Sequence, residues 1–357
     1  MRIAVQTVSS VVAGLGLLLL AGCASVGPAT VTRDRFDYVT TISDSWKRQT
    51  LLNLLKMRYA DAPVFMDVSS VISSYSLEGD VSLGGQFATS GSSNIGTVGA
   101  TGRYADKPTI TYQPLIGDKF AKSLMAPIPV TGILSLIQSG YPADIVMRIC
   151  VNSINGLENA FGGAGSPRAG DPRFHELMTA MHESQASGSM GFRVKVVDDK
   201  QAVVMFMRPT TEQAARHGRE IGELLGLDTS EREFSVLYGS FPANDREIAV
   251  LTRSLLQVMA DLASYVDVPA TDIAEGRVSD PRRSEEQQRL FPPLIAVRQG
   301  SSPPDDAHVA VPYRNGWFCI DVRDQRSKLM LNFLMFIFSL TEGGPSQGAP
   351  IVTVPAR

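Results

Sequence analysis

The chain of 357 residues has the composition of a folded globular protein, because 44% of its residues are hydrophobic and only 19% are charged. That balance excludes an intrinsically disordered chain. The formal net charge of −3 and the absence of basic clusters beyond short pairs such as Arg282-Arg283 argue against nucleic acid as a partner.

The first 23 residues have the three parts of a secretory signal. Arg2 supplies a positive start, residues 11–20 form an apolar stretch, and the small residues Ala21 and Gly22 precede Cys23. A stretch of about ten apolar residues is too short to cross a bilayer, which needs about 20. The segment therefore predicts export of the chain rather than a transmembrane anchor.

The motif Leu-Ala-Gly-Cys at 20–23 resembles the lipobox of bacterial lipoproteins. The resemblance implies cleavage between Gly22 and Cys23, loss of residues 1–22, and acylation of the Cys23 thiol, which makes membrane lipid the first partner of the chain. Two or more acyl chains hold a protein stably on a membrane. Since no aspartate follows the cysteine, the resemblance implies the periplasmic face of the outer membrane of a Gram-negative bacterium. A conventional signal with a coincidental cysteine is the alternative.

The mature chain is predicted to have an α+β fold with mixed helices and antiparallel strands. Residues 23–35 are polar and predict a lipidated tether, and a helix is expected over 45–59. Residues 36–155 are expected to form a first α+β lobe. The glycine-rich stretch 156–172 predicts a loop before a second α+β lobe at 173–357.

A long β-hairpin at about 71–113 is the most regular feature of the first lobe. Apolar and polar residues alternate over 71–87, and a second extended run at 94–113 follows a Gly/Ser turn. A usual strand has about five or six residues, so a hairpin of this length is expected to project beyond its own domain.

The hairpin register is predicted from a four-residue turn between Thr89 and Asn94. Large side chains then lie opposite small ones on one face, and opposite charges meet on the other. The predicted pairs are Leu83 with Ala100, Gly79 with Tyr104, and Asp80 with Arg103.

The second lobe alternates predicted helices and strands. In chain order we expect a helix at 172–187, a hairpin of 192–197 and 202–208, and a helix at 211–225. A strand at 233–238 and a helix at 245–265 follow, and then a hairpin around the turn 314–316 and a strand at 351–354. Residues 144–155 fit neither the helical nor the strand period. A helix at 324–340 is apolar almost all round and is expected in the core.

Three short strings and the closing apolar helix resemble a group of Gram-negative outer-membrane lipoproteins. The strings are Met66–Ser70, Ile154–Asn159 and Trp317–Asp321. Because that group has no established activity, the resemblance implies a location and no mechanism.

The remaining cysteines and the histidines give no cofactor or metal site. An exported compartment permits a disulfide between Cys150 and Cys319, and two separate buried thiols are the alternative. The four histidines lack metal-ligand spacing, so no metal and no cofactor are expected.

Four short motifs suggest chemistry without completing it. The G-x-S-x-G match at 344–348 lacks a preceding strand and a following histidine, and the glycines at 162–165 lack the lysine of a phosphate loop. His175 and His182 are seven residues apart instead of four, which predicts a solvated helix face. The charged residues at 321–326 predict a helix cap, with a cleft lining as the alternative.

The sequence therefore favours a non-enzymatic structural or assembly role through protein contacts in the cell envelope. One alternative is a homo-oligomeric envelope channel or secretion component whose hairpins form a shared β-barrel. Another envelope protein that adds a strand to the hairpin edge is a further candidate partner. The second alternative is an envelope enzyme with an unrecognised site.

Overall fold

The computed structural model describes residues 28–355 with gaps at 73–74, 87–94, 107, 164–166, 198–199, 281–283 and 342–351. The fold is α+β, as the sequence predicts. The chain divides into two compact units. One comprises Met1–Ser45, Met66–Leu115 and Gln347–Arg357, and the other comprises Trp46–Phe65 and Ile116–Ser346.

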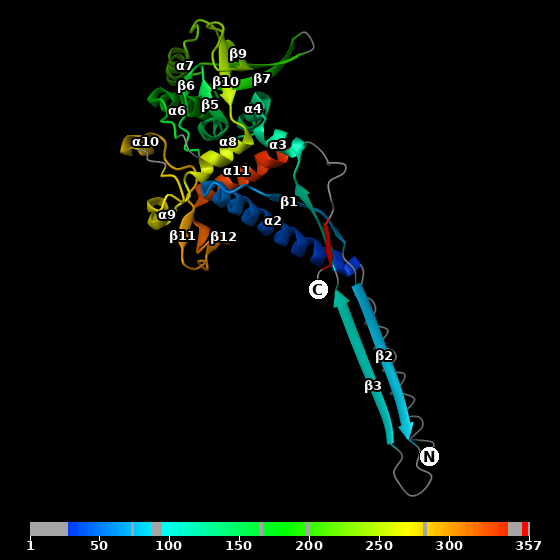
Figure 1. Ribbon diagram of the computed structural model, residues 1–357. Helices are drawn as coiled ribbons and strands as arrows, with labels where there is room; N and C mark the ends of the chain where they lie inside the picture. The colour runs from blue at the N-terminus through cyan, green and yellow to red at the C-terminus, as the bar shows by residue number, and fades with distance from the viewer. Residues whose placement is uncertain are drawn as a thin grey trace. The chain divides into compact units, whose positions relative to one another are not determined.

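The first unit contains two separate sheets (Figure 1). Strands β1 (Phe65–Ile72), β4 (Thr109–Leu115) and β14 (Val352–Pro355) form a three-stranded sheet in the order β1-β4-β14. Strands β2 (Tyr75–Gln86) and β3 (Ile95–Asp106) form a two-stranded antiparallel sheet, which we call the ribbon. The predicted hairpin of 71–113 is therefore divided between two sheets, and the predicted strand at 351–354 is confirmed.

Helix α2 (Pro28–Arg58) is 31 residues long and starts well before the helix that the sequence predicted at 45–59. The prediction of a tether over 23–35 is therefore wrong for residues 28–35. Pro28 suits the first helical position, and no glycine or proline interrupts the helix after it. Residues 23–27 of the predicted tether lie outside the described residues.

The second unit contains a six-stranded sheet in the order β6-β5-β10-β9-β8-β7 (Figure 1). Only the β9–β10 pair is parallel. The strands are β5 (Val151–Ile154), β6 (Leu157–Glu158), β7 (Met190–Val197), β8 (Lys200–Met207), β9 (Glu233–Tyr238) and β10 (Glu247–Thr252). Because β5 pairs with β10, the predicted lobe boundary at 156–172 lies inside one unit, and the structure corrects it.

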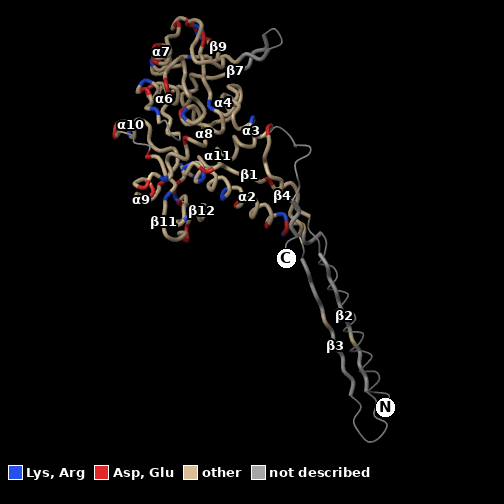
Figure 2. Tube along the Cα trace, viewed as in Figure 1, with Lys and Arg blue, Asp and Glu red and all other residues tan. Residues whose placement is uncertain are grey.

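Nine further helices, the last part of α2 and a small sheet belong to the described part of this unit. The helices are α3 (Asp118–Met125), α4 (Val130–Gln138), α5 (Ala143–Cys150), α6 (Pro172–Ala186), α7 (Glu212–Leu225), α8 (Leu255–Ala263), α9 (Ala270–Ala274), α10 (Glu285–Leu290) and α11 (Gln325–Thr341). The small sheet has the order β11-β13-β12, from β11 (Arg298–Gly300), β12 (Ala307–Tyr313) and β13 (Gly316–Asp321). Charges of both signs are interspersed over this unit (Figure 2), which agrees with the small net charge.

The predicted helix at 245–265 is wrong in its first half, where the chain forms β10. Ile248, Ala249 and Val250 are buried in the sheet, so three consecutive apolar residues serve a strand rather than one face of a helix. Helix α8 starts only after Ser254, which makes a capping box with Gln257. The ambiguous stretch 144–155 contains both structures, since α5 ends at Cys150 and β5 follows directly.

Helix α11 supplies much of the core of the second unit, as its apolar sequence predicts. Met330, Leu331, Leu334 and Ile337 are at most 3% exposed. The helix is nevertheless not buried all round, because Leu329 is 65% and Phe336 44% exposed. Among the described residues, no helix has the length and apolarity needed to cross a bilayer.

Candidate functional site

The histidines do not converge on a site in the described part of the chain. On α6, His182 Nδ1 lies 2.9 Å from Asp144 Oδ1, whereas His175 packs against the ring of Phe291. Within the described residues no three His, Cys, Asp or Glu side chains are placed to hold a metal ion.

Cys150 and Cys319 are both free thiols, so the disulfide that the sequence permitted is not formed. Cys150 is fully buried at the end of α5, and burial raises the pKa of its thiol to about 12. Burial also raises the pKa of Cys319. Both groups are therefore poor nucleophiles at neutral pH.

The other motifs have structural roles or lie outside the described residues. Asp324 Oδ1 accepts from the Ser327 amide at 3.0 Å and Oδ2 from its hydroxyl at 2.6 Å, which confirms the predicted cap of α11. The amide of Gly162 donates to Asp261. The G-x-S-x-G match at 344–348 lies outside the described residues.

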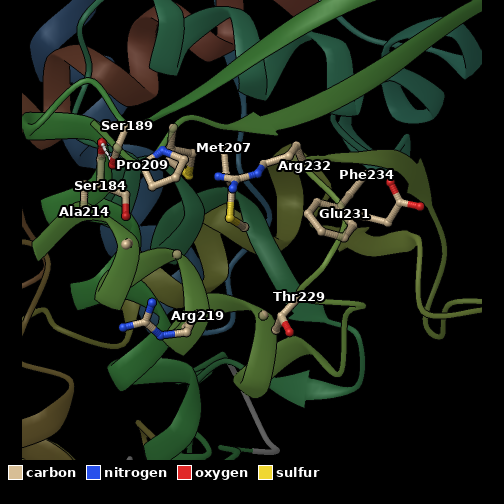
Figure 3. A pocket seen from close by; sticks show the side chains of 14 residues that line it. Ser184, Ser189, Met207, Pro209, Ala214, Arg219, Thr229, Glu231, Arg232 and Phe234 are labelled. Carbon is tan, nitrogen blue, oxygen red and sulfur yellow. Dashed lines mark hydrogen bonds between the residues drawn. The ribbon is translucent and has the colours of Figure 1, made fainter. Parts of the chain in front are cut away.

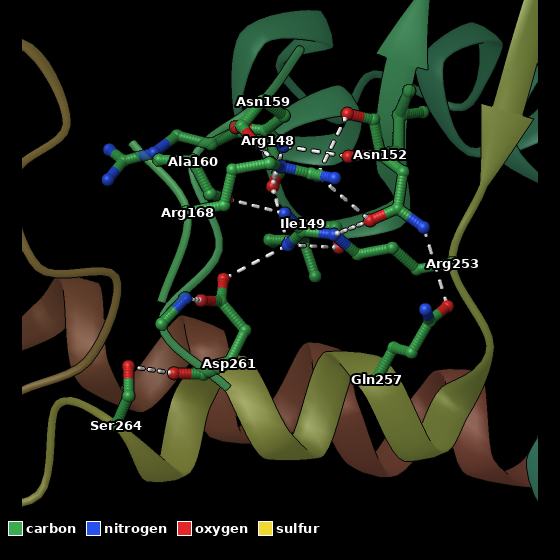
Figure 4. A network of polar contacts seen from close by, with 12 residues as sticks. Arg148, Ile149, Asn152, Asn159, Ala160, Arg168, Arg253, Gln257, Asp261 and Ser264 are labelled. Atoms are coloured by element: carbon green, nitrogen blue, oxygen red, sulfur yellow. Dashed lines mark hydrogen bonds and ion pairs between the residues drawn. The ribbon is translucent and has the colours of Figure 1, made fainter. Parts of the chain in front are cut away.

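The sequence did not predict a buried polar network around Arg253 (Figure 4). The Arg253 side chain is 0% exposed, and its Nη1 lies 3.0 Å from Asp261 Oδ2. Nη1 also donates to the carbonyls of Arg148 and Ile149, Nη2 to the carbonyl of Ala160, and Nε to Asn152 Oδ1.

This network is structural, because every nitrogen of the guanidinium already donates to a protein acceptor. Asp261, near the end of α8, also accepts from the amide of Gly162 at 2.6 Å. The pair therefore ties the loop after β6 to α5 and α8 in the core of the second unit. The acceptors are carbonyls, an amide oxygen and a carboxylate of the protein itself, which is the arrangement expected of a buried structural arginine.

A second cluster holds the turn between β12 and β13 against the end of α2. The guanidinium carbon of Arg314 lies 4.4 Å from the centroid of the Tyr59 ring, and the Tyr313 hydroxyl donates to Asp61. The Tyr59 hydroxyl donates to Asp272 Oδ2 at 2.7 Å. Burial and this hydrogen bond raise the pKa of Tyr59, so that the hydroxyl stays protonated as a donor.

The ribbon register differs from the prediction by two residues. Arg103 lies opposite Glu78 and not Asp80, which pairs with Thr101. The same shift changes the other two predicted pairs. In place of Leu83 with Ala100, the structure pairs Leu83 with Val98 and Val81 with Ala100. In place of Gly79 with Tyr104, it pairs Gly79 with Gly102 and Leu77 with Tyr104. The predicted turn at 90–93 lies outside the described residues.

The ribbon is the candidate functional site, because its strands have no third partner among the residues that the structure describes. The sheet contains twelve paired positions and only β2 and β3 within the described part of the chain. An isolated two-stranded hairpin is at best marginally stable in water. Its two outer edges carry backbone donors and acceptors that are able to pair with another strand.

The ribbon is also rich in glycine. Two of its cross-strand pairs join glycine to glycine, Gly79 with Gly102 and Gly85 with Gly96. Such positions have no side chains that would keep another backbone at a distance. Glu78 opposite Arg103 is the one cross-strand pair of opposite charges in the ribbon.

The predicted cleavage and lipidation residues, Gly22 and Cys23, lie outside the described residues, so lipidation stays a prediction. Comparison of this chain with protein-family models, with curated proteins and with solved structures gave no match.

Proposed function

We propose that this chain is a lipid-anchored protein of the cell envelope whose ribbon makes the protein contacts for a structural or assembly role. The observation that carries the proposal is the two-stranded sheet of twelve paired positions without a third strand in the described residues. Natural proteins cover or disrupt such edges, for example with lysine or proline. The ribbon strands contain neither residue.

The expected lipid anchor supports association by the ribbon. Acylation at Cys23 would hold every copy and its partners on one membrane surface. Confinement of two binding elements raises their effective concentration, so that weak edge-to-edge pairing becomes sufficient for assembly. The anchor and the ribbon thus belong to one function, although each is tested separately.

A second candidate is association of identical copies. Each ribbon offers two edges of the same kind, so that an edge of one copy is able to pair with an edge of the next and extend a shared sheet. The first and second candidates differ only in the identity of the strand that is added.

Photo-crosslinking in intact envelopes tests the proposal. A benzophenone side chain replaces Thr101, which is exposed on the ribbon, and in a matched control it replaces Thr179, which is exposed on α6 of the second unit. We expect a discrete adduct from position 101 and none of that size from position 179. An adduct of two chain masses identifies self-association, and any other discrete mass identifies a different envelope protein.

Absence of an adduct at position 101, or the same adduct from both positions, would contradict the proposal. The anchor is checked in the same cells by replacement of Cys23 with serine. That variant is expected to leave the membrane fraction, and full retention there would show that lipid on Cys23 is not the anchor.

A further inference from the structure

A cavity of about 180 Å³ lies in the second unit, between the end of α6, the strands β7 to β9, and α7 (Figure 3). We call it the α6–α7 pocket. Pockets for drug-sized ligands have volumes of about 300–1,000 Å³, so this one fits a smaller molecule. It is a site separate from the ribbon, which belongs to the first unit.

Part of the wall of the α6–α7 pocket is apolar, and small residues of α7 leave the space open. Met190, Met207 and Phe234 come from the three strands. On α7 the lining residues are Ala214, Ala215, Gly218 and Gly222. A Cβ added at Gly222 would lie 2.9 Å from Thr229, so a larger residue there would close part of the space. The pocket thus accepts an apolar body.

Two arginines give the pocket a net positive charge at its rim. Arg219 and Arg232 are exposed, line the pocket, and have no side-chain hydrogen bond or ion pair within the described residues. The acidic residue of the lining, Glu231, is already paired with Arg246 at 2.8 Å. In the part of the chain that the structure describes, neither arginine is therefore held in an ion pair.

A buried hydroxyl supplies a polar group on the inner wall. Ser184 is 2% exposed, and its Oγ has no hydrogen-bond partner within the described residues. The neighbouring Ser189 hydroxyl donates to the Ser184 carbonyl at 3.1 Å, so it is not aimed at Ser184 Oγ. A buried hydroxyl without a partner is unfavourable, and a carboxylate oxygen of a bound ligand would be able to accept from it.

We propose that the α6–α7 pocket binds a small carboxylate with a short apolar body. Arg219 and Arg232 hold the carboxylate, for which the planar guanidinium is suited, and the apolar wall holds the body. A phosphate would satisfy the arginines but would leave the wall formed by Met190, Met207 and Phe234 without a partner. The combination of wall and rim therefore favours the carboxylate.

Calorimetric titration of the mature chain without lipid tests this assignment, with butyrate as the probe. Butyramide, which has the same shape without the charge, and inorganic phosphate, which has charge without an apolar body, are the comparison ligands. We expect saturable binding of butyrate at millimolar concentration and at least about tenfold weaker binding of both comparison ligands.

Variants on α7 and β9 locate the binding. Arg232→Gln and Arg219→Gln are each expected to weaken butyrate binding about tenfold. Arg216→Gln is the matched control, because Arg216 is also exposed on α7 but pairs with Glu212 and does not line the pocket. Ala215→Leu fills the pocket without a change in charge and is expected to abolish binding.

Each contrary result overturns the proposal. Butyrate that does not bind, butyramide that binds equally well, or a loss of binding in Arg216→Gln equal to that in Arg232→Gln would show that this pocket is not a carboxylate site. Phosphate that binds as tightly as butyrate would show that the arginines attract anions without use of the apolar wall. Circular dichroism of each variant separates loss of binding from loss of fold.

Discussion

Among single residues, Arg253 and Asp261 are expected to matter most for the stability of the second unit. Both are buried, and the pair lies in a network in which each nitrogen of the guanidinium donates to a protein acceptor. Loss of one partner would leave the other charge buried without compensation. The pair is therefore expected to contribute strongly to the stability of the second unit.

Replacement of Asp261 by asparagine tests this expectation. The free energy of unfolding in urea should fall by about 3–5 kcal/mol, because the Arg253 charge loses its counter-charge inside the core. The matched control is Asp118→Asn, which removes an exposed ion pair with Lys122 on α3. Such exposed pairs contribute about 1 kcal/mol or less. Equal losses in the two variants would contradict the structural role of the network.

The two free cysteines give a second prediction. With a pKa of about 12, Cys150 carries a thiolate fraction on the order of 10⁻⁴ at pH 8. A chain that starts at residue 24 should therefore react very slowly with iodoacetamide at Cys150 in the native state and rapidly in urea. Mass spectrometry of non-reduced peptides should find both thiols free. A peptide pair joined through Cys150 and Cys319 would refute the assignment.

The cap of α11 predicts a pH dependence. Burial acts to raise the pKa of Asp324, but hydrogen bonds from the Ser327 hydroxyl and amide outweigh it and hold this pKa below its usual value. A carboxyl with a lowered pKa in the folded state stabilises the fold above the unfolded pKa, and this contribution is lost as the pH falls through the folded value.

Asp324→Ala should therefore lower the free energy of unfolding by about 1 kcal/mol at pH 7. The difference between the variant and the parent should shrink below the ordinary aspartate pKa of about 4. Unfolding curves in urea at pH 7 and at low pH measure both values. A difference that grows as the pH falls would have the wrong sign for this account.

The Arg253 network also shows what the sequence does not reveal at this scale. Its acceptors come from residues 148–160 and from α8, and nothing in their spacing indicates that the fold brings them together. The helix cap at Asp324 was predictable, because a cap depends only on residues within one turn.

Among the helices and strands, the ribbon shows what an alternating pattern predicts and what it does not. The hairpin was predictable from its period of two, and the shift of two residues leaves every residue on its predicted face. The register itself was not predictable, because it depends on the turn. Gln86 pairs with Ile95, so eight residues separate the paired strands rather than four.

The stretch in which a strand runs directly into a helix was also hard to predict, because its structure depends on neighbouring strands. Residues 247–252 continue the apolar stripe of α8 in sequence, yet they form a strand because β5 and β9 flank them. Such tertiary partners override local preference. Helix α7, by contrast, agrees with its prediction at both ends, since Thr211 caps its start and Gly226 its end.

The end of α7 gives a prediction with an internal control. Gly226 has φ of 65°, so Gly226→Ala places a side chain in the left-handed region and should cost about 1 kcal/mol of stability. Gly218→Ala, inside the same helix, should raise stability by about 0.5–1 kcal/mol. Its new Cβ would lie 3.5 Å from Met207 Sδ, an ordinary contact. Urea unfolding measures both, and the reverse order would be inconsistent with the structure.

At the scale of the whole molecule, the α+β class was predictable and the division into units was not. The glycine-rich stretch at 156–172 suggested a boundary, but β5 before it pairs with β10 after it. The observed units instead consist of several chain segments each. The pairing of β14 with β4 joins residues more than 200 positions apart, a contact that no local pattern predicts.

We propose above that the ribbon assembles this protein in the envelope. The most direct measurement is the mass of the detergent-extracted native complex by analytical ultracentrifugation, for the parent chain and for a variant in which Asn-Gly replaces residues 75–106. We expect a complex of at least two chains for the parent and a single chain for the variant, with an unchanged unfolding transition of the second unit. A parent that sediments as a single chain, or a variant that retains the full mass of the complex, would contradict it.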